Sequence, residues 1–336
     1  MNRLNILFLL VAISCLPLRA QESADERIDK MEKFISKLPK MAGDINLRYR
    51  YDDTDGANGF DVRRARLDFR GNVIESLEYR VHLEFANGPK ILDASVRWNI
   101  NEHVAVQAGQ YKIPFSLENP YNPNKLEMID NALAITHLVN YSDVSDIAAN
   151  GRDIGVSVIG NFLRRKGFNI IDYYFGVFNG SGINTGDANK DKDFSGMLSI
   201  NPSKHLTFAV SHYNGTVGTQ GDTFHRTRNG FGVKYDDNRL LVRSEYIHGK
   251  TGELNSDGAY AVCGYYVHPK VQTVARYDYF KRDLSDNSTT QQDYTVGVNY
   301  FPVTNVRLQF NYTRRTKNDI NYTDNNYFVT QLWIRF

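Results

Sequence analysis

The sequence predicts an all-β fold, namely a 16-stranded antiparallel transmembrane β-barrel with a long third outer loop that folds inward. Three observations predict this fold. Apolar and polar residues alternate along most of the chain, short and long connections alternate between those stretches, and the last alternating stretch ends on an aromatic residue, Phe336. Successive side chains of a strand point to opposite faces, so this period of two is the pattern of strands with one apolar face.

The composition of the chain narrows the class of protein further. It has 336 residues and a formal net charge of +2, and this near balance argues against a basic nucleic-acid groove. Its mean hydropathy is −0.47, and after the N-terminus the sequence has no apolar run of about 18 residues, which excludes a bundle of membrane helices. Aromatic residues are nevertheless frequent, with Tyr 21 and Phe 19. A polar average with many aromatics fits an all-β protein, either soluble or membrane-embedded.

Residues 1–20 are expected to form a secretory signal peptide. Arg3 supplies the positive start, an apolar stretch follows, and Ala20 ends a plausible cleavage site. An alternative remains open, because residues 12–15 loosely resemble a lipoprotein processing box that ends at Cys15. If cleavage follows Ala20, Cys263 is the only mature thiol, so neither an internal disulfide nor a multi-cysteine metal site is possible. The chain is therefore expected to be exported.

Residues 21–42 are expected to form a short charged leader before the barrel domain, which is expected to cover residues 43–336. Apolar residues in this leader recur at helix-like spacing: Ile28, Met31, Phe34, Ile35 and Leu38. A short amphipathic helix or flexible leader accounts for the spacing, and so does a short coiled coil that helps to form a trimer. Two or three heptads do not decide between these alternatives.

The strands are the next elements that the alternation predicts. The candidate strands lie near residues 44–51, 60–71, 77–86, 91–100, 103–112, 152–162, 168–179, 193–201, 205–213, 227–235, 239–249, 258–267, 270–280, 291–301, 305–315 and 326–336. Most are close to the roughly 9–11 residues that a tilted strand needs to cross a bilayer. Strands of soluble sheets average only about 5–6 residues. Strand length therefore favours a membrane barrel.

The connections between these strands alternate in length. Short turns are expected at residues 201–204, 236–239, 268–269 and 302–305, and longer polar loops at 52–59, 180–192, 214–226, 250–257, 281–290 and 316–325. Bacterial barrels have short periplasmic turns and longer extracellular loops. A closed sheet also pairs every backbone N–H and C=O without leaving an edge in lipid. The final strand, with Phe328, Leu332 and Phe336 on one face, resembles the signal by which outer-membrane barrels are recognised for assembly.

Residues 113–150 do not alternate, and a loop of that length usually has a function. Counted from a periplasmic N-terminus this is the third outer loop, with a possible helix from 124 to 139. The lumen of a 16-stranded barrel is a water-filled channel, so an inward loop would set the size limit. A loop over the rim, or against a neighbouring subunit, is the alternative. The candidate constriction residues of this region are Lys112, Glu118, Lys125, Glu127 and Asp130.

The first four strands carry many arginines on the face expected to line the lumen. The candidate solute-binding residues are Arg48, Arg50, Arg63, Arg64, Arg66, Arg80 and Arg97. Guanidinium groups bind phosphate and carboxylate in bidentate fashion, and rings of Arg or Lys are the usual device of anion pores. Carboxylates share these faces, however, so a network of salt bridges that stiffens the wall is an equal alternative. Arg63 and Arg64 are adjacent, so at least one of them must lie at a bulge.

Four stretches resemble the phosphate- and polyphosphate-selective porin family (porins O and P) of Gram-negative outer membranes. They are GFDVRRARLDFRG at 59–71, GQYKIPFS at 109–116, GRDIGV at 151–156 and YYFGVFNG at 173–180. The resemblance implies a 16-stranded barrel, a homotrimer, and passive diffusion of small anionic solutes such as phosphate. It also implies phosphate binding at Arg63, Arg64 and Arg66. Selective members of the family have in addition a ladder of lysines, and lysines are few on these faces here.

Two other classes of protein are alternatives to the porin. A barrel enzyme would need a catalytic group at the rim. The adjacent Ser211 and His212 lie on one strand and point to opposite faces, so they cannot form a nucleophile–base pair. The sequence has no GxSxG, HExxH or P-loop motif, and we expect no catalytic residue, metal or cofactor. A secreted soluble β protein that binds carbohydrate remains the second alternative, because Tyr and Trp faces also bind sugars.

Overall fold

The computed structural model describes residues 27–31, 38–54, 56, 58–165, 167–320 and 323–336. The chain divides into two units, Met1–Pro39 and Lys40–Phe336, which are described separately. The predicted signal peptide and the alternative lipid site at Cys15 lie outside the described residues, as does most of the predicted leader. Within the leader, residues 27–31 are helical. The rest of the description concerns the second unit.

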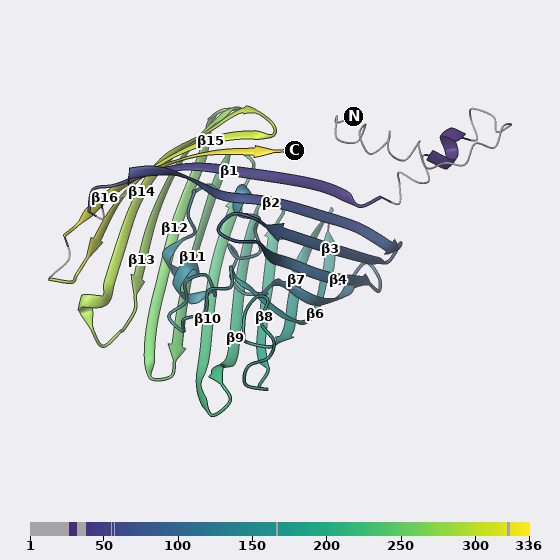
Figure 1. Cartoon of the computed structure of the whole chain (residues 1–336), viewed down its shortest axis with the longest axis horizontal. Coiled ribbons are helices and arrows are strands. Elements are labelled where there is room, and N and C mark those ends of the chain that lie inside the picture. The colour runs from purple at the N-terminus through teal and green to yellow at the C-terminus, as the bar shows by residue number, and fades with distance from the viewer. Residues whose placement is uncertain (1–26, 32–37, 55, 57, 166, 321–322) are drawn as a thin grey trace. The chain divides into compact units, whose positions relative to one another are not determined.

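The second unit is a closed antiparallel barrel, as the sequence predicts (Figure 1). Each strand pairs with its neighbours in sequence, and β1 pairs with β16 to close the sheet. The strands are β1 (Lys40–Asp52), β2 (Asn58–Ile74), β3 (Leu77–Glu84), β4 (Lys90–Asn99), β5 (Val104–Lys112), β6 (Arg152–Arg165), β7 (Phe168–Phe178), β8 (Asp193–Ser203), β9 (Leu206–Thr219), β10 (Asp222–Asp236), β11 (Leu240–Thr251), β12 (Leu254–His268), β13 (Val271–Lys281), β14 (Thr290–Val303), β15 (Val306–Lys317) and β16 (Asn325–Arg335). Because the sheet closes on itself, it has no unpaired edge strand, which is the arrangement that lipid requires.

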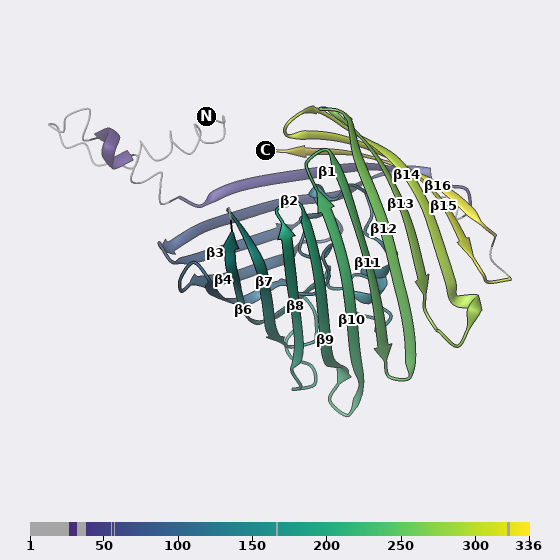
Figure 2. The ribbon, with the colours of Figure 1, turned by 180° about the vertical axis from the view of Figure 1, so that it is seen from behind.

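The inner and outer faces of the barrel differ in polarity along the strands that the alternation predicted. On β15, Arg307 and Gln309 are buried, whereas Phe310 and Tyr312 on the opposite face are more than 40% exposed. Exposed Val, Phe, Tyr and Ile side chains recur in the same way on the outer face of the other strands. The inner face is therefore polar and the outer face apolar. Figure 2 shows the long wall of β6 to β14 from behind.

Several strands extend further than the sequence predicted. The expected long loop at 214–226 is wrong, because β9 continues to Thr219 and β10 begins at Asp222. The loop expected at 250–257 is similarly reduced to the two residues between β11 and β12, and β1 begins at Lys40 instead of 44. These strand ends are rich in Thr, Asn, Gly and Asp. Past the apolar band neither face needs to be apolar, so pairing continues where the alternation of hydrophobicity has ended.

Residues 113–151 connect β5 to β6 and are here called the β5–β6 segment. This segment contains two short helices. They are the short η1 (Pro123–Lys125) and α3 (Leu133–Leu138), so the helix expected from 124 to 139 is only partly formed. A third short helix, η2 (Asn287–Thr289), precedes β14. No helix in the described ranges is both long and apolar enough to cross a membrane. The main buried apolar cluster joins this segment to the walls, with Phe115, Ile135 and Leu138 packed among wall residues such as Ile247 and Phe280.

Candidate functional site

A buried carboxylate of β11 anchors the first residues of the β5–β6 segment. Glu245 accepts the backbone N–H of Leu117 at 2.7 Å and that of Glu118 at 2.9 Å. It also accepts the hydroxyls of Ser116 and Tyr260 at 3.1 and 2.6 Å. A buried carboxylate with four donors is fully satisfied. Glu245 therefore fixes the backbone of the segment where it leaves β5.

Two arginines, one on β11 and one on β13, hold the middle of the segment. Arg243 on β11 pairs with Glu118 at 3.1 Å and with Glu127 at 3.0 Å, and all three side chains are buried. Arg276 on β13 donates to the backbone carbonyl of Asp130 at 2.8 Å. Two of the acidic candidates are thus committed to Arg243. The structure thus places these two constriction candidates, Glu118 and Glu127, against β11 and not against the predicted arginines of β1–β4.

The remaining anchors extend around most of the barrel. These hydrogen bonds join Asn46 of β1 to Asn124, Arg63 of β2 to Ile129, Ser195 of β8 to Pro114, Arg226 and Arg228 of β10 to Asn140 and Asp143, Asp278 of β13 to Leu133, Asn299 of β14 to Glu127, and Arg307 and Asn311 of β15 to Leu126 and Ile129. In the described part of the chain, β3, β4 and β7 make no hydrogen bond or ion pair with the segment. The wall of β3 and β4 carries two of the predicted arginines, Arg80 and Arg97.

The adjacent Arg63 and Arg64 reach the same face because the strand is irregular between them. The pairing of β2 with β1 shifts from Asn46↔Arg64 to Leu47↔Val62, so Arg63 occupies a bulge, as the sequence predicted. Arg63 donates to the carbonyl of Ile129 at 2.6 Å and pairs with the carboxylate of Asp130 at 2.5 Å. A bulge re-aims a side chain in this way.

Most of the predicted arginines have a carboxylate partner. Arg48 pairs with Asp61, Arg50 with Asp52, Arg66 with Glu84, and Arg80 with both Asp68 and Asp93. Asp93 is 1% exposed and also pairs with Arg152 of β6 at 2.8 Å. For these four arginines, and for Arg63, the salt-bridge network that was an equal alternative from the sequence describes the geometry. Their charge is largely balanced within the wall.

Arg64 and Arg97 differ from the others, because neither has a carboxylate within ion-pair distance among the described residues. Arg64 is 8% exposed, and its buried Nη1 has no hydrogen-bond acceptor. Arg63 and Arg66 lie on either side of it in β2. A buried guanidinium without an acceptor is costly, so the structure holds an unsatisfied positive charge at this point of the wall.

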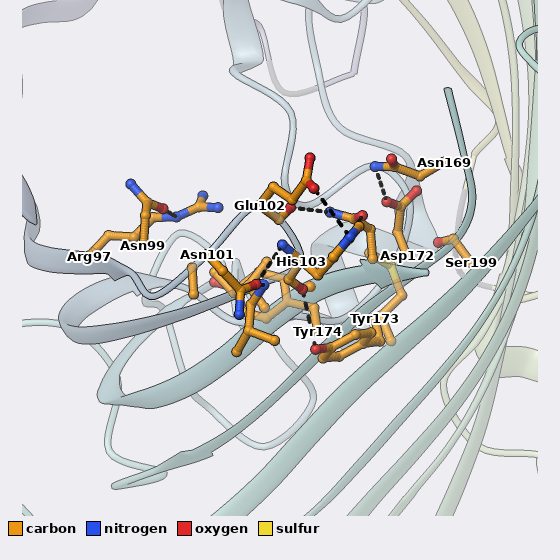
Figure 3. Close-up of a pocket in the computed structure, with 16 residues that line it drawn as sticks. Arg97, Asn99, Asn101, Glu102, His103, Asn169, Asp172, Tyr173, Tyr174 and Ser199 are labelled. Carbon is orange, nitrogen blue, oxygen red and sulfur yellow. Dashed lines mark hydrogen bonds and ion pairs between the residues drawn. The ribbon is translucent and has the colours of Figure 1, made fainter. Parts of the chain in front are cut away.

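Arg97 lines a pocket of about 580 Å³ at the end of the barrel with short turns (Figure 3). Its Nε donates to Asn99 at 3.1 Å. Across the pocket, Asp172 of β7 accepts from Asn169 and Asn201, and Tyr173 and Tyr174 follow it on the same strand. The pocket therefore combines the guanidinium of Arg97 with the carboxylates of Glu102 and Asp172 and with amide, imidazole, hydroxyl and aromatic groups.

The two lysine candidates have different surroundings. Lys112, the last residue of β5, donates to the backbone carbonyl of Tyr121 at 2.6 Å and to that of Asn119. Lys125, at the end of η1, is exposed. Lys112 thus bonds only carbonyl oxygens, with no carboxylate in ion-pair distance among the described residues, and it ties the start of the segment to the end of β5.

Asp130 is the one acidic candidate that faces the predicted arginines. Burial alone would raise its pKa, but the guanidinium of Arg63, with the more distant Arg48, Arg276 and Arg64, outweighs this effect and lowers the pKa of Asp130 below its usual value. A nearby positive charge favours the ionised carboxylate. Asp130 therefore stays charged and neutralises part of the positive wall at neutral pH.

The sequence analysis missed the buried arginines of the later strands. They are Arg152, Arg226, Arg228, Arg243, Arg276 and Arg307, all 8% exposed or less. Each lies on the polar face of an alternating strand, and this position is the signal in the sequence that indicates it. Ser211 and His212, which the sequence analysis placed on opposite faces, have separate partners. Ser211 accepts the N–H of Ser116, and His212 bonds Asn229.

Comparison with known proteins agrees with this geometry. A model of the family "phosphate-selective porin O and P" matches residues 40–237 and 238–336, which is the whole barrel. The chain belongs to this family. It is an outer-membrane porin, a barrel that forms a channel. No curated protein sequence matches the chain significantly.

Solved structures show how widely the fold of this porin is shared. An anion-selective porin from Comamonas acidovorans is 14% identical with a TM-score of 0.69, and the match covers 89% of this chain and 99% of that one. OmpF of Salmonella typhi, in complex with daunomycin, is 12% identical with a TM-score of 0.70 and coverages of 90% and 99%. The outer-membrane channel DcaP of Acinetobacter baumannii is 13% identical, with a TM-score of 0.62 and coverages of 89% and 97%. At such identities the similarity concerns the fold alone.

Proposed function

We propose that this porin conducts small anions, phosphate among them, along the wall formed by β1 to β4, and that Arg64 is the residue that attracts them. The observation that carries the proposal is the unpaired, buried guanidinium of Arg64 on a wall whose other arginines, apart from Arg97, are ion-paired. Paired charges cancel at short distance, whereas an unpaired one leaves a field in the adjoining water. An anion that reaches Nη1 supplies the missing acceptor.

The β5–β6 segment forms the constriction in this proposal. Its anchors to β1, β2, β8 to β11 and β13 to β15 support this role, because residues of one short segment reach these walls together only from within a closed sheet. The path that remains open then lies beside β3 and β4, next to Arg66, Arg80 and Arg97. The segment and the arginine wall together fix which solutes pass.

The N-terminal signal peptide and a homotrimeric assembly belong to the same proposal. Residues 1–20 have the order of charge, apolar stretch and cleavage site that export requires. OmpT of Vibrio cholerae, which has a TM-score of 0.60 with this chain, was solved as a trimer form. A folded trimer should migrate as one species on a gel until it is boiled, and a monomeric species before heating would contradict the assembly.

Reversal potentials in planar bilayers under a salt gradient test the anion preference. The wild-type protein should prefer Cl⁻ to K⁺, and Arg64→Gln should reduce this preference several-fold, because a charge at about 4 Å is worth roughly 1 kcal/mol even in water. Arg164→Gln is the matched control. It removes the same charge from a side chain that is 59% exposed near the β6–β7 turn, and it should leave the preference unchanged. Cation preference of the wild type, or equal effects of both variants, would reject the assignment.

A further inference from the structure

Another buried guanidinium without a carboxylate partner among the described residues lies on β15, at the end of the barrel with short turns. Arg307 is 4% exposed, and both its Nε and its Nη2 are buried without an acceptor. Among the described residues no other side chain has two such atoms. Its remaining nitrogen, Nη1, donates to the carbonyl of Leu126 at 3.0 Å. No carboxylate lies within ion-pair distance of Arg307 in the described ranges, because the carboxylate of the neighbouring Glu127 pairs with Arg243.

The two orphan nitrogens form one edge of the guanidinium plane. Nε–H and Nη2–H point in parallel, and together they make the fork that binds a carboxylate or phosphate through two hydrogen bonds. The third corner of the plane is held by Leu126, so the fork is fixed in direction. This geometry suits an oxyanion with two oxygens.

Aromatic rings hold the plane from its sides. The guanidinium carbon lies 5.8 Å from the ring centroid of Trp333 and 6.0 Å from that of Phe301. Trp333 faces Arg307 directly across β15 and β16, and the Tyr266 ring lies 6.0 Å from Phe301. These rings are only partly buried, so the cluster of Tyr266, Phe301, Arg307 and Trp333 lies just below the inner surface.

Trp333 adds a third orphan donor to this cluster. Its indole Nε1 is buried and has no acceptor. An indole N–H is only a donor, so only an oxygen or other acceptor from outside can satisfy it. Three unsatisfied donors on two residues that face each other indicate one missing acceptor group, because buried polar groups are normally paired.

We propose that Arg307 and Trp333 form a second oxyanion site of this porin, separate from Arg64 and lying near the periplasmic mouth. The site rests on the proposed anion channel, since it lies on the same inner face. A phosphate or carboxylate oxygen pair bonds Nε and Nη2 of Arg307, and the indole of Trp333 donates to the same anion. Anions that leave the constriction are held here before they reach the periplasm.

The fluorescence of Trp333 tests the site directly. The chain has two tryptophans, and Trp98 lies on the outer face of β4 with 53% exposure, so Trp98→Phe leaves Trp333 as a single reporter in the detergent-solubilised trimer. Phosphate should change its emission in a saturable way, and KCl at equal ionic strength should not. Acetate should compete if the site accepts any oxyanion and fail to compete if it requires phosphate. A change that KCl reproduces, or no change with phosphate, would overturn the site.

Two variants in this background separate the site from the rest of the channel. Arg307→Lys keeps the charge and a donor for the Leu126 carbonyl but removes the fork, so it should weaken phosphate binding about tenfold, the scale of a lost hydrogen bond to a charged group. Arg64→Lys should leave the Trp333 titration unchanged. Equal affinity in the Arg307→Lys protein would refute the site, as would an equal loss in both variants.

A thermal measurement covers the case in which Arg307→Lys does not fold. In an Arg64→Lys background, phosphate should raise the melting temperature, because a ligand that binds only the folded state stabilises it. Adding Trp333→Phe, which keeps a ring but removes the donor, should shrink that rise, and an undiminished rise would refute the site. Reversal potentials on the same proteins identify which proposal fails. An anion-selective channel with an unresponsive Trp333 rejects only the second site, whereas a channel without anion preference rejects the proposed function.

Discussion

Arg63 and Asp130 lie in direct contact, with Nη2 of Arg63 2.5 Å from Oδ1 of Asp130. Arg63 comes from the bulge of β2 and Asp130 from the β5–β6 segment, so this ion pair joins the arginine wall to the segment that narrows the lumen in the proposed function. It also cancels one positive charge beside the unpaired Arg64. In the proposed function, the anion preference of the channel therefore depends on the charge of Asp130.

The first prediction concerns Asp130→Asn. Removal of this carboxylate leaves Arg63 with a free charge, so the preference for Cl⁻ over K⁺ at pH 7 should rise roughly two- to fivefold, the effect of one charge close to the path. Reversal potentials in a KCl gradient measure it. Asp191→Asn, in the exposed outer loop between β7 and β8, is the matched control and should change nothing. An unchanged or lower preference in Asp130→Asn would show that Asp130 does not restrain the wall.

The same pair sets a second prediction, on pH. The pKa of Asp130 in the folded protein is lowered, so the ion pair is intact above the usual Asp pKa of about 4 and is lost only as the pH falls through the lowered value. The difference in selectivity between the wild type and Asp130→Asn should therefore stay constant from pH 8 to pH 5. It should disappear only in more acidic solution. A difference that vanishes near pH 6 would contradict the lowered pKa.

Much of the barrel was predictable because its signal is local. The alternation on β15, Arg307, Gln309 and Asn311 against Phe310 and Tyr312, is written in consecutive residues, and so is the bulge at Arg63 and Arg64. Strand ends were not predictable in this way. Beyond the apolar band the residues of β9 and β10 pair through their backbones whatever their side chains, so the expected loop at 214–226 is strand.

The partners of the charged residues were not predictable, because they depend on the path of the β5–β6 segment. Glu118 and Arg243 are 125 positions apart in the chain, and nothing near either residue indicates that they meet. The seven predicted arginines look alike in sequence. Only the three-dimensional neighbours separate the paired Arg66, with Glu84 at 2.6 Å, from the unpaired Arg64.

A third prediction tests the anchoring of the segment by Glu245. Glu245→Gln keeps the shape of the side chain but removes its charge and turns one acceptor into a donor, opposite the N–H groups of Leu117 and Glu118. Hydrogen bonds to a charged group contribute about 1.5–3 kcal/mol each, so the melting temperature should fall and the single-channel current should become noisier. Glu253→Gln, whose side chain is fully exposed, should behave as wild type. A quiet channel of unchanged conductance would show that the segment is held without Glu245.

A fourth prediction uses the close approach of α3 to β12. A Cβ atom at Gly258 would lie 2.7 Å from Cβ of Ala134 and 2.8 Å from its Cα, so a side chain there must displace the helix. Gly258→Val should cost about 1–3 kcal/mol of overpacking and should change the conductance. Ala259→Val adds the same side chain at the next position, which points to the outer face, and should change neither property. Equal behaviour of the two variants would mean that α3 does not pack on this strand.

The fifth prediction concerns Asp93, which accepts Arg152 at 2.8 Å, Arg80 at 2.9 Å and His82 at 3.1 Å. Asp93→Asn keeps the volume of the side chain but leaves the buried Arg152 and the half-buried Arg80 without their shared carboxylate. Loss of one partner from a buried ion pair typically costs about 3–5 kcal/mol, so the variant should unfold at a clearly lower temperature on heated gels. Since Arg152 loses its counter-charge and Arg80 keeps only Asp68, the folded fraction should also prefer anions more strongly than the wild type. Asp172→Asn removes a carboxylate that bonds only amides, Asn169 and Asn201, and should cost far less stability. If both variants lose the same stability, the two arginines do not depend on Asp93, and the arginine wall is held by its other contacts.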